Sequence, residues 1–173
     1  MNNRSNIQKL TISAMVVALY IVVLYLTQSI SFGAYQIRIA TSLYALSYLF
    51  PFLVVPMGIA NLISNFFFGG LGPIDMIGGF LVGIFTTGTI VLLRRYNFGA
   101  HWIVLPITFI PSLCVSAWLS YLLNIPYSAL VVNLIVGQFV CGVVGSILAR
   151  TLEKRMFGTT SVEEVVDAET EKI

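Results

Sequence analysis

Residues 39–68 read IATSLYALSYLFPFLVVPMGIANLISNFFF and contain no charged side chain. A membrane-spanning helix needs roughly 20 apolar residues to cross a hydrocarbon core about 30 Å thick, so this run is too long for one helix. Pro51 and Pro56 interrupt it. Each proline removes a backbone N–H donor and disfavours helix in the residue before it. We therefore predict that the run divides near Pro51 into a short helix and a second helix.

The composition of the whole chain agrees with a membrane protein. Of its 173 residues, 58% are hydrophobic and 9% are charged, whereas soluble domains carry about 25% charged residues. This leaves no polar surface for a soluble catalytic domain, a nucleic-acid-binding face or an ATPase domain, and no G-x-x-x-x-G-K-[ST] phosphate loop is present. Between residues 10 and 149 the charged side chains are Arg38, Asp75, Arg94 and Arg95.

Hydropathy predicts an all-α integral membrane fold, a bundle of six transmembrane helices within residues 1–155. The apolar stretch that begins at Leu10 is longer than the apolar core of a signal peptide, so we expect this first helix to stay in the protein uncleaved. Residues 156–173 are acidic, and we expect them to form a flexible cytoplasmic tail. The predicted spans are residues 10–28, 38–50, 52–68, 74–93, 101–123 and 127–149.

The distribution of basic residues favours six spans over five. Cytoplasmic loops are enriched in Lys and Arg. With five spans, Arg94 and Arg95 would lie on the side opposite the N-terminus. With six spans, both termini are cytoplasmic and only Arg38 lies toward the outside. Seven basic residues then share the cytoplasmic side: Arg4, Lys9, Arg94, Arg95, Arg150, Lys154 and Arg155.

In this topology the polar residues of several helices gather in the outer half of the bundle. Depth follows from the rise of 1.5 Å per helical residue, and residues four apart, such as Asn61 and Asn65, share a face. The sequence therefore predicts a pocket that is open to the outside. Its candidate substrate-binding residues are Arg38, Asp75, Asn61, Asn65, Asn133, Gln138, Tyr35 and Tyr44.

Each of these residues also has a structural interpretation. Asn and Gln in spanning helices often form interhelical hydrogen bonds, and tyrosines collect at membrane interfaces. Arg38 and Asp75 could pair with each other or be solvated at the interface. Ionisable groups within a membrane nevertheless favour a functional site.

Small residues form stripes on three predicted helices. Ala14 and Ala18 lie four residues apart near the cytoplasmic end of the first helix, where another helix can approach closely. The alternative is packing inside the bundle. The same pattern occurs on the fourth and sixth helices, at Gly79, Gly83, Gly137, Cys141, Gly145 and Ala149, where intramolecular packing is the favoured interpretation.

We expect neither catalysis nor a metal site. Nucleophilic catalysis needs a nucleophile and a base held together, but the single histidine, His101, falls at the cytoplasmic end, far from the outer polar residues. Zinc needs a cluster of Cys, His or carboxylate ligands. The two cysteines, Cys114 and Cys141, lie in apolar runs, where a free cysteine behaves as a small hydrophobe.

Two short motifs resemble the substrate-binding (S) components of energy-coupling factor (ECF) vitamin transporters, particularly the QueT type that handles queuosine precursors. One motif is QIRIA at residues 36–40, extending to Leu43. The other begins with Ala60 and Asn61 and continues through residues 65–66, 69, 71–72 and 75. Six spans extend the resemblance over most of residues 10–155.

The resemblance implies a multi-pass protein of the bacterial plasma membrane that binds a small heteroaromatic micronutrient of the 7-deazaguanine type. It implies docking of Ala14 and Ala18, which resemble the family's Ala-x-x-x-Ala element, onto a coupling transmembrane subunit. Two ATPase subunits would supply the energy, so ATP is used by partner chains and this chain carries no cofactor. Asp75 could then accept N–H bonds from a guanine-like edge or pair with an aminomethyl cation.

One position departs from the family pattern. Thr41 stands where an acidic residue is expected after Arg38, which indicates a divergent branch and leaves the ligand open. The alternatives are an S component or stand-alone carrier for another vitamin or nucleobase, a membrane assembly protein without a ligand, and an intramembrane enzyme.

Overall fold

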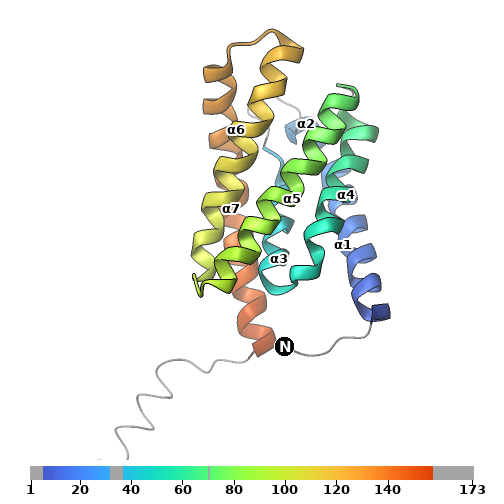
Figure 1. The fold of residues 1–173 in the computed structure, drawn as a ribbon, viewed down its shortest axis with the longest axis vertical. Coiled ribbons are helices and arrows are strands. Elements are labelled where there is room, and N and C mark those ends of the chain that lie inside the picture. The colour runs from blue at the N-terminus through green and yellow to red at the C-terminus, as the bar shows by residue number, and fades with distance from the viewer. Residues whose placement is uncertain (1–5, 32–36, 70, 158–173) are drawn as a thin grey trace, which may run out of the picture.

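The computed structural model describes residues 6–31, 37–69 and 71–157, and every regular element in them is a helix. The prediction of an all-helical fold is confirmed for these residues (Figure 1). In chain order the elements are α1 (Asn6–Leu26), α2 (Gln28–Ser31), η1 (Ile39–Ala45), α3 (Leu46–Leu49), η2 (Pro51–Leu53), α4 (Val54–Ser64), η3 (Asn65–Gly69), α5 (Pro73–Arg95), η4 (Ala100–Ile103), α6 (Val104–Leu123) and α7 (Tyr127–Phe157).

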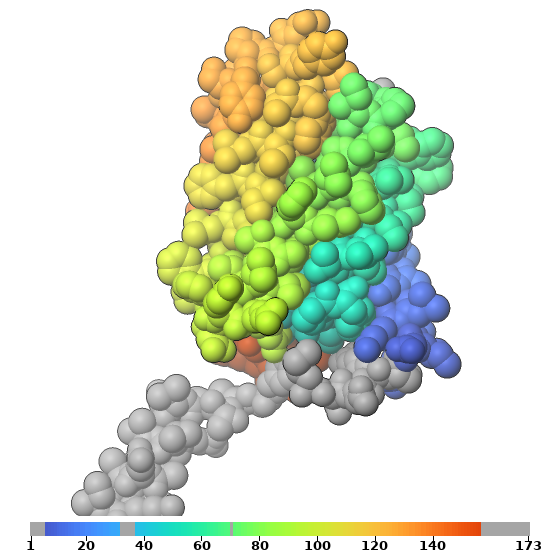
Figure 2. All heavy atoms as spheres, viewed as in Figure 1, coloured from blue at the N-terminus to red at the C-terminus, as the bar shows by residue number. Residues whose placement is uncertain are grey.

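Within the described residues, five helical segments are long and apolar enough to cross a membrane: Asn6–Leu26, Pro51–Gly69, Pro73–Arg95, Ala100–Leu123 and Tyr127–Met156. Large apolar side chains cover their outer surfaces, as at Phe67 and Phe85, which are 66% and 64% exposed. Such a surface suits contact with lipid rather than water. Figure 2 shows one face of the bundle, formed by α4, α5 and α6 side by side.

The sixth predicted span differs from the other five. Ile39–Leu49 is a shorter apolar helix made of the 3₁₀ segment η1 followed by α3. It covers about 20 Å at 2.0 Å per 3₁₀ residue and 1.5 Å per α residue. Residues 40–49 are all buried, in contact with α1, α5, α6 and α7. The segment is therefore an interior element of the bundle, and the count of six membrane-spanning helices stays a prediction.

The start of α1 and the end of α7 lie at the same end of the bundle (Figure 1). We call this the inner end and the opposite one, which holds α2, the outer end, following the predicted topology. The cytoplasmic location of the inner end stays a prediction. Residues 158–173 of the predicted acidic tail lie outside the described residues, and α7 continues eight residues beyond the predicted end of the last span at 149.

Proline positions explain the helix breaks in the stretch from residue 39 to residue 68. Phe50 has φ −126° and ψ 83°, which ends α3, and Pro51 begins η2. Pro56 falls in the first turn of α4. Backbone N–H groups in a first turn have no intrahelical partner, so prolines there cost no hydrogen bond. The predicted division near Pro51 therefore occurs where the two prolines remove no backbone hydrogen bond from a helix.

Contacts hold the interior segment along its length. The rings of Tyr44 and Tyr20 stack with centroids 5.8 Å apart and an angle of 9° between their planes. Near the inner end, Arg94 donates to the carbonyl of Tyr48 and its guanidinium carbon lies 5.1 Å from the Tyr48 ring centroid. The Tyr48 hydroxyl donates to the carbonyl of Phe98 at 2.8 Å. Arg94 therefore satisfies one of the C-terminal carbonyls of a buried helix.

The small residues divide into two groups. Those on α5 and α7 are buried, as the packing interpretation predicts. A Cβ added at Gly83 would lie 3.0 Å from the Gly58 Cα, and one at Gly145 would lie 2.8 Å from the Ser42 carbonyl. On α1, by contrast, Ala14 and Ala18 are exposed, which excludes packing inside this bundle as their role.

We predict that Gly83→Leu lowers the melting temperature of the detergent-solubilised protein, because a side chain there forces α4 and α5 apart and overpacking costs about 1–3 kcal/mol. Gly88→Leu is the matched control, since no heavy atom lies within 4 Å of a Cβ built there. Equal melting temperatures for the two variants would show that this helix contact is not required.

Candidate ligand-binding site

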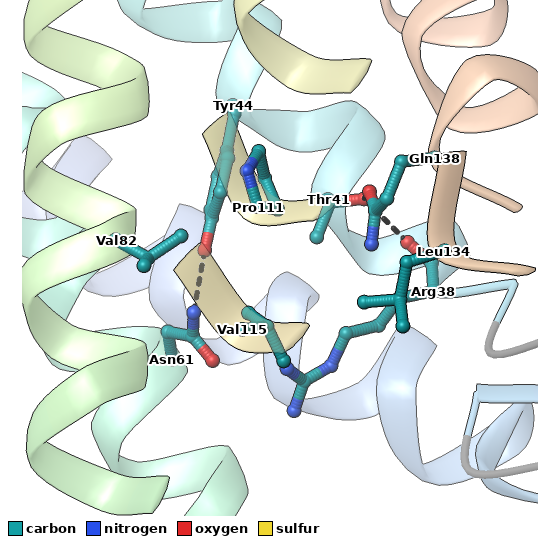
Figure 3. Close-up of a pocket in the computed structure, with 9 residues that line it drawn as sticks. All are labelled: Arg38, Thr41, Tyr44, Asn61, Val82, Pro111, Val115, Leu134 and Gln138. Atoms are coloured by element: carbon teal, nitrogen blue, oxygen red, sulfur yellow. Dashed lines mark hydrogen bonds between the residues drawn. The ribbon is translucent and has the colours of Figure 1, made fainter. Parts of the chain in front are cut away.

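A small cavity lies inside the bundle, where the interior segment faces α4, α5, α6 and α7. Figure 3 shows two polar pairs on different sides of it, Tyr44 with Asn61 and Thr41 with Gln138, and apolar side chains between them. Its cavity volume is about 20 Å³, enough for a water molecule, so a ring-sized ligand requires lining side chains to move. The lining residues are Arg38, Thr41, Tyr44, Asn61, Val82, Pro111, Val115, Leu134 and Gln138.

Asn61 presents a hydrogen-bond acceptor within this site. Its Nδ2 donates to the Gly79 carbonyl and to the Tyr44 hydroxyl, both at 2.8 Å. A backbone carbonyl can only accept, so the Gly79 contact fixes which end of the amide is nitrogen. The Asn61 Oδ1 is buried and has no hydrogen-bond partner among the described residues. A buried acceptor without a donor is costly, and a ligand N–H would satisfy it.

Thr41 joins the interior segment to α7. Its hydroxyl oxygen lies 2.7 Å from the Arg38 carbonyl oxygen and 2.8 Å from Gln138 Oε1. Thr41 and Gln138 are 2% and 3% exposed, so this contact is shielded from solvent. A side-chain amide carries both an acceptor oxygen and a donor NH2, so Gln138 can pair with a hydroxyl or, after rotation, with a carboxylate at position 41. The contact therefore links the interior segment to α7 without explaining why this chain has a threonine there.

Arg38 contacts a second layer of polar residues, which lies outside the cavity lining and consists of Asn65, Asp75 and Trp118. Its guanidinium donates to Asn65 Oδ1, and Asn65 Nδ2 donates to the backbone carbonyl of Asp75 at 3.0 Å. The Asp75 carboxylate accepts from the indole N–H of Trp118 at 3.0 Å. Asp75 is 6% exposed and is absent from the cavity lining. The sequence left open whether Arg38 and Asp75 pair with each other. In the structure Asn65 lies between them, bound to the Arg38 guanidinium and to the Asp75 backbone carbonyl.

The structure brings together only part of the predicted site. Arg38, Tyr44, Asn61 and Gln138 line the cavity, whereas Asn65 and Asp75 lie in the layer behind Arg38. Asn133 is half-buried on α7 and is not among the lining residues. Tyr35 lies outside the described residues.

Sequence reasoning missed the apolar lining and Trp118. Leu134 stands four residues before Gln138, so the helical repeat of a predicted polar residue could have found it. Pro111 and Val115 share one face of α6 by the same spacing, but no predicted site residue marked that face. Trp118 was one aromatic among many in a membrane chain, and nothing in its local sequence indicated a buried partner.

Comparison with known proteins supplies the family. The profile of the QueT transporter family matches residues 10–154. The chain belongs to the QueT transporter family. No curated protein and no solved structure matches the chain.

Membership confirms the resemblance drawn from the motifs around Arg38 and Asn61. Together with the apolar helices it makes the chain a membrane transporter of the multi-pass class. This is a transporter family, which favours transport over catalysis. In this QueT family member, polar side chains of several helices meet at the cavity.

We predict that Asn61→Leu destabilises the solubilised protein by about 1–3 kcal/mol, because the substitution removes two buried hydrogen bonds, one to the Tyr44 hydroxyl and one to the Gly79 carbonyl. Asn133→Leu, on the half-buried face of α7, is the control and should change stability by less than about 0.5 kcal/mol. Thermal unfolding in one detergent measures both. A larger loss for Asn133→Leu would contradict this assignment.

Proposed function

We propose that this chain is the substrate-binding component of an ECF-type importer and captures a flat heteroaromatic micronutrient, a queuosine precursor of the 7-deazaguanine type, from the extracellular side. The observation that carries the proposal is the cavity of a QueT family member, in which an arginine and a buried amide acceptor face apolar walls. Such pockets, mostly apolar with a few placed polar groups, are typical of small-ligand sites.

The cavity suits the edge pattern of a guanine-like ring. That ring has a carbonyl oxygen, which Arg38 can bind as a donor, and adjacent N–H groups, which the open Asn61 Oδ1 can accept. The side chains of Val82 and Leu134 supply apolar surface for the ring faces. Because Asp75 is turned toward Trp118, we assign the ring N–H groups to Asn61 rather than to Asp75.

A second candidate is another vitamin or nucleobase, taken by an S component or by a stand-alone carrier. Thr41 favours this second candidate, because a threonine that contacts Gln138 stands where the family pattern has an acidic residue. A nucleobase with the same carbonyl and N–H edge would fit Arg38 and Asn61 equally well. Competition between purines in the binding experiment below separates the two candidates.

Energy for uptake would come from other chains, because no phosphate-binding loop is present in this one. We propose that a coupling transmembrane subunit, which carries two ATPase subunits, docks on the exposed face of α1. Ala14 and Ala18 are exposed on this face, while Tyr20 and Leu24 on the same helix are fully buried. The alanines therefore point away from the bundle, toward a surface that a second helix can approach closely.

We predict that labelled 7-deazaguanine binds the purified protein and that guanine competes better than adenine, which lacks the carbonyl and N–H edge. Arg38→Ala should weaken binding about 10- to 100-fold, because hydrogen bonds to a charged group contribute about 1.5–3 kcal/mol. Arg95→Ala, exposed at the inner end, is the control. Equal competition by adenine, or unchanged binding by Arg38→Ala, would contradict the proposal.

We predict that Ala14→Trp abolishes co-purification with the coupling subunit and ATP-driven uptake but leaves 7-deazaguanine binding unchanged, because the cavity lies on the opposite side of the buried Tyr20. Ala117→Trp, at an exposed alanine on α6, is the matched control and should leave both intact. Parallel loss of binding and assembly in Ala14→Trp would show that the substitution disrupts the whole protein and would contradict docking at the α1 face.

A further inference from the structure

Asp75 is buried in the outer half of the bundle, yet both carboxylate oxygens are directed to groups outside the cavity lining. Its Oδ1 accepts from Trp118 Nε1 at 3.0 Å. Its Oδ2 lies against Gly69, where an added Cβ would be 2.9 Å away. The carboxylate is thus enclosed between α6 and the end of η3.

The backbone of Asp75, by contrast, is connected to the cavity. Its carbonyl accepts from Asn65 Nδ2 at 3.0 Å, and Asn65 Oδ1 accepts from the Arg38 guanidinium. Because a carbonyl only accepts and a guanidinium only donates, the Asn65 amide can occupy one orientation. A displacement of the Asp75 carbonyl therefore displaces the acceptor that holds Arg38.

Two adjacent glycines of α5 make this arrangement possible. A Cβ at Gly78 would lie 2.9 Å from Cζ2 of Trp118, so the indole packs where a side chain would otherwise be. A Cβ at Gly79 would fall on the Asn65 amide nitrogen. Asp75 is three and four residues before these glycines, on the same side of the helix. The first turns of α5 are therefore shaped to receive both Trp118 and Asn65.

We propose that Trp118 and Asp75 are positioning residues for Arg38 and make no contact with the ligand. The indole N–H anchors the Asp75 carboxylate and with it the first turn of α5, and Asn65 passes that position to the guanidinium. Without the indole N–H, a buried carboxylate loses its donor and turns toward other donors or water. The acceptor that Asn65 presents to Arg38 then moves, and the guanidinium moves with it. The link between Arg38 and ligand affinity rests on the proposed function, whereas the positioning itself does not.

The first test needs no ligand. Full-length protein is treated with phenylglyoxal, and the modification rate of each arginine is followed by peptide mass spectrometry. In Trp118→Phe, Arg38 should react several times faster than in the wild type, while exposed Arg95 at the inner end keeps its rate. Tyr121→Phe, three residues further on α6 at a 79% exposed position, is the matched control and should resemble the wild type.

An Arg38 rate in Trp118→Phe equal to that in Tyr121→Phe overturns the proposal. If Trp118→Phe fails to fold, Asn65→Ala takes its place, because it breaks the same chain one step nearer to Arg38 while leaving the indole and carboxylate in contact. An unchanged Arg38 rate in folded Asn65→Ala equally overturns the proposal.

The second test is a double-mutant cycle on 7-deazaguanine affinity with Trp118→Phe and Arg38→Gln. If Trp118 acts through Arg38, the double variant binds about as weakly as Arg38→Gln alone, because coupled residues are not additive. If Trp118 and Asp75 touch the ligand themselves, the two fold-losses multiply, and the proposal is overturned. Absence of binding by the wild type would refute the proposed ligand, and the Arg38 reaction rates would still decide the positioning role.

Discussion

The enclosure of Ile39–Leu49 by longer helices is the constraint on which the rest of the structure depends. A segment of this length cannot cross the hydrocarbon core as an independent helix, so its backbone has to be satisfied and covered by the bundle. Arg94 bonds the carbonyl of Tyr48 near the inner end, and Tyr20 stacks on Tyr44 further along. With the segment fixed inside, Thr41 and Tyr44 reach the cavity from it, and Arg38 reaches the cavity from the residue just before it.

A charged group inside the bundle then requires a supporting layer. A partly buried guanidinium needs well-placed acceptors, and Asn65 provides one because η3 and the glycines of α5 let its amide approach. The polar residues are thus arranged as a lining that faces the cavity and a layer behind it that includes Asp75 and Trp118. This order explains how a chain with few charges holds a guanidinium beside a cavity with partly apolar walls.

Charge and proline placement predicted the long helices and the break near Pro51, because both are local properties of a membrane chain. The rotation of each helix was not predictable, since it depends on tertiary contacts. The sequence therefore marked Asp75 as a candidate residue but gave no sign of its partner, Trp118. The predicted last span ended at 149 because charge marks the membrane boundary, whereas α7 continues to Phe157 since lysine, arginine and glutamate are good helix formers in water.

The most direct test of a ligand site between the interior segment and its enclosing helices is to identify what the protein retains. Full-length protein is purified from cells supplied with 7-deazaguanine, and the bound small molecules are extracted and identified by mass spectrometry. The account predicts that the wild type and Leu113→Phe, altered on the exposed face of α6, retain the compound. Val115→Phe, which fills the cavity, should lose it. Equal retention by Val115→Phe, or none by the wild type, would contradict the account.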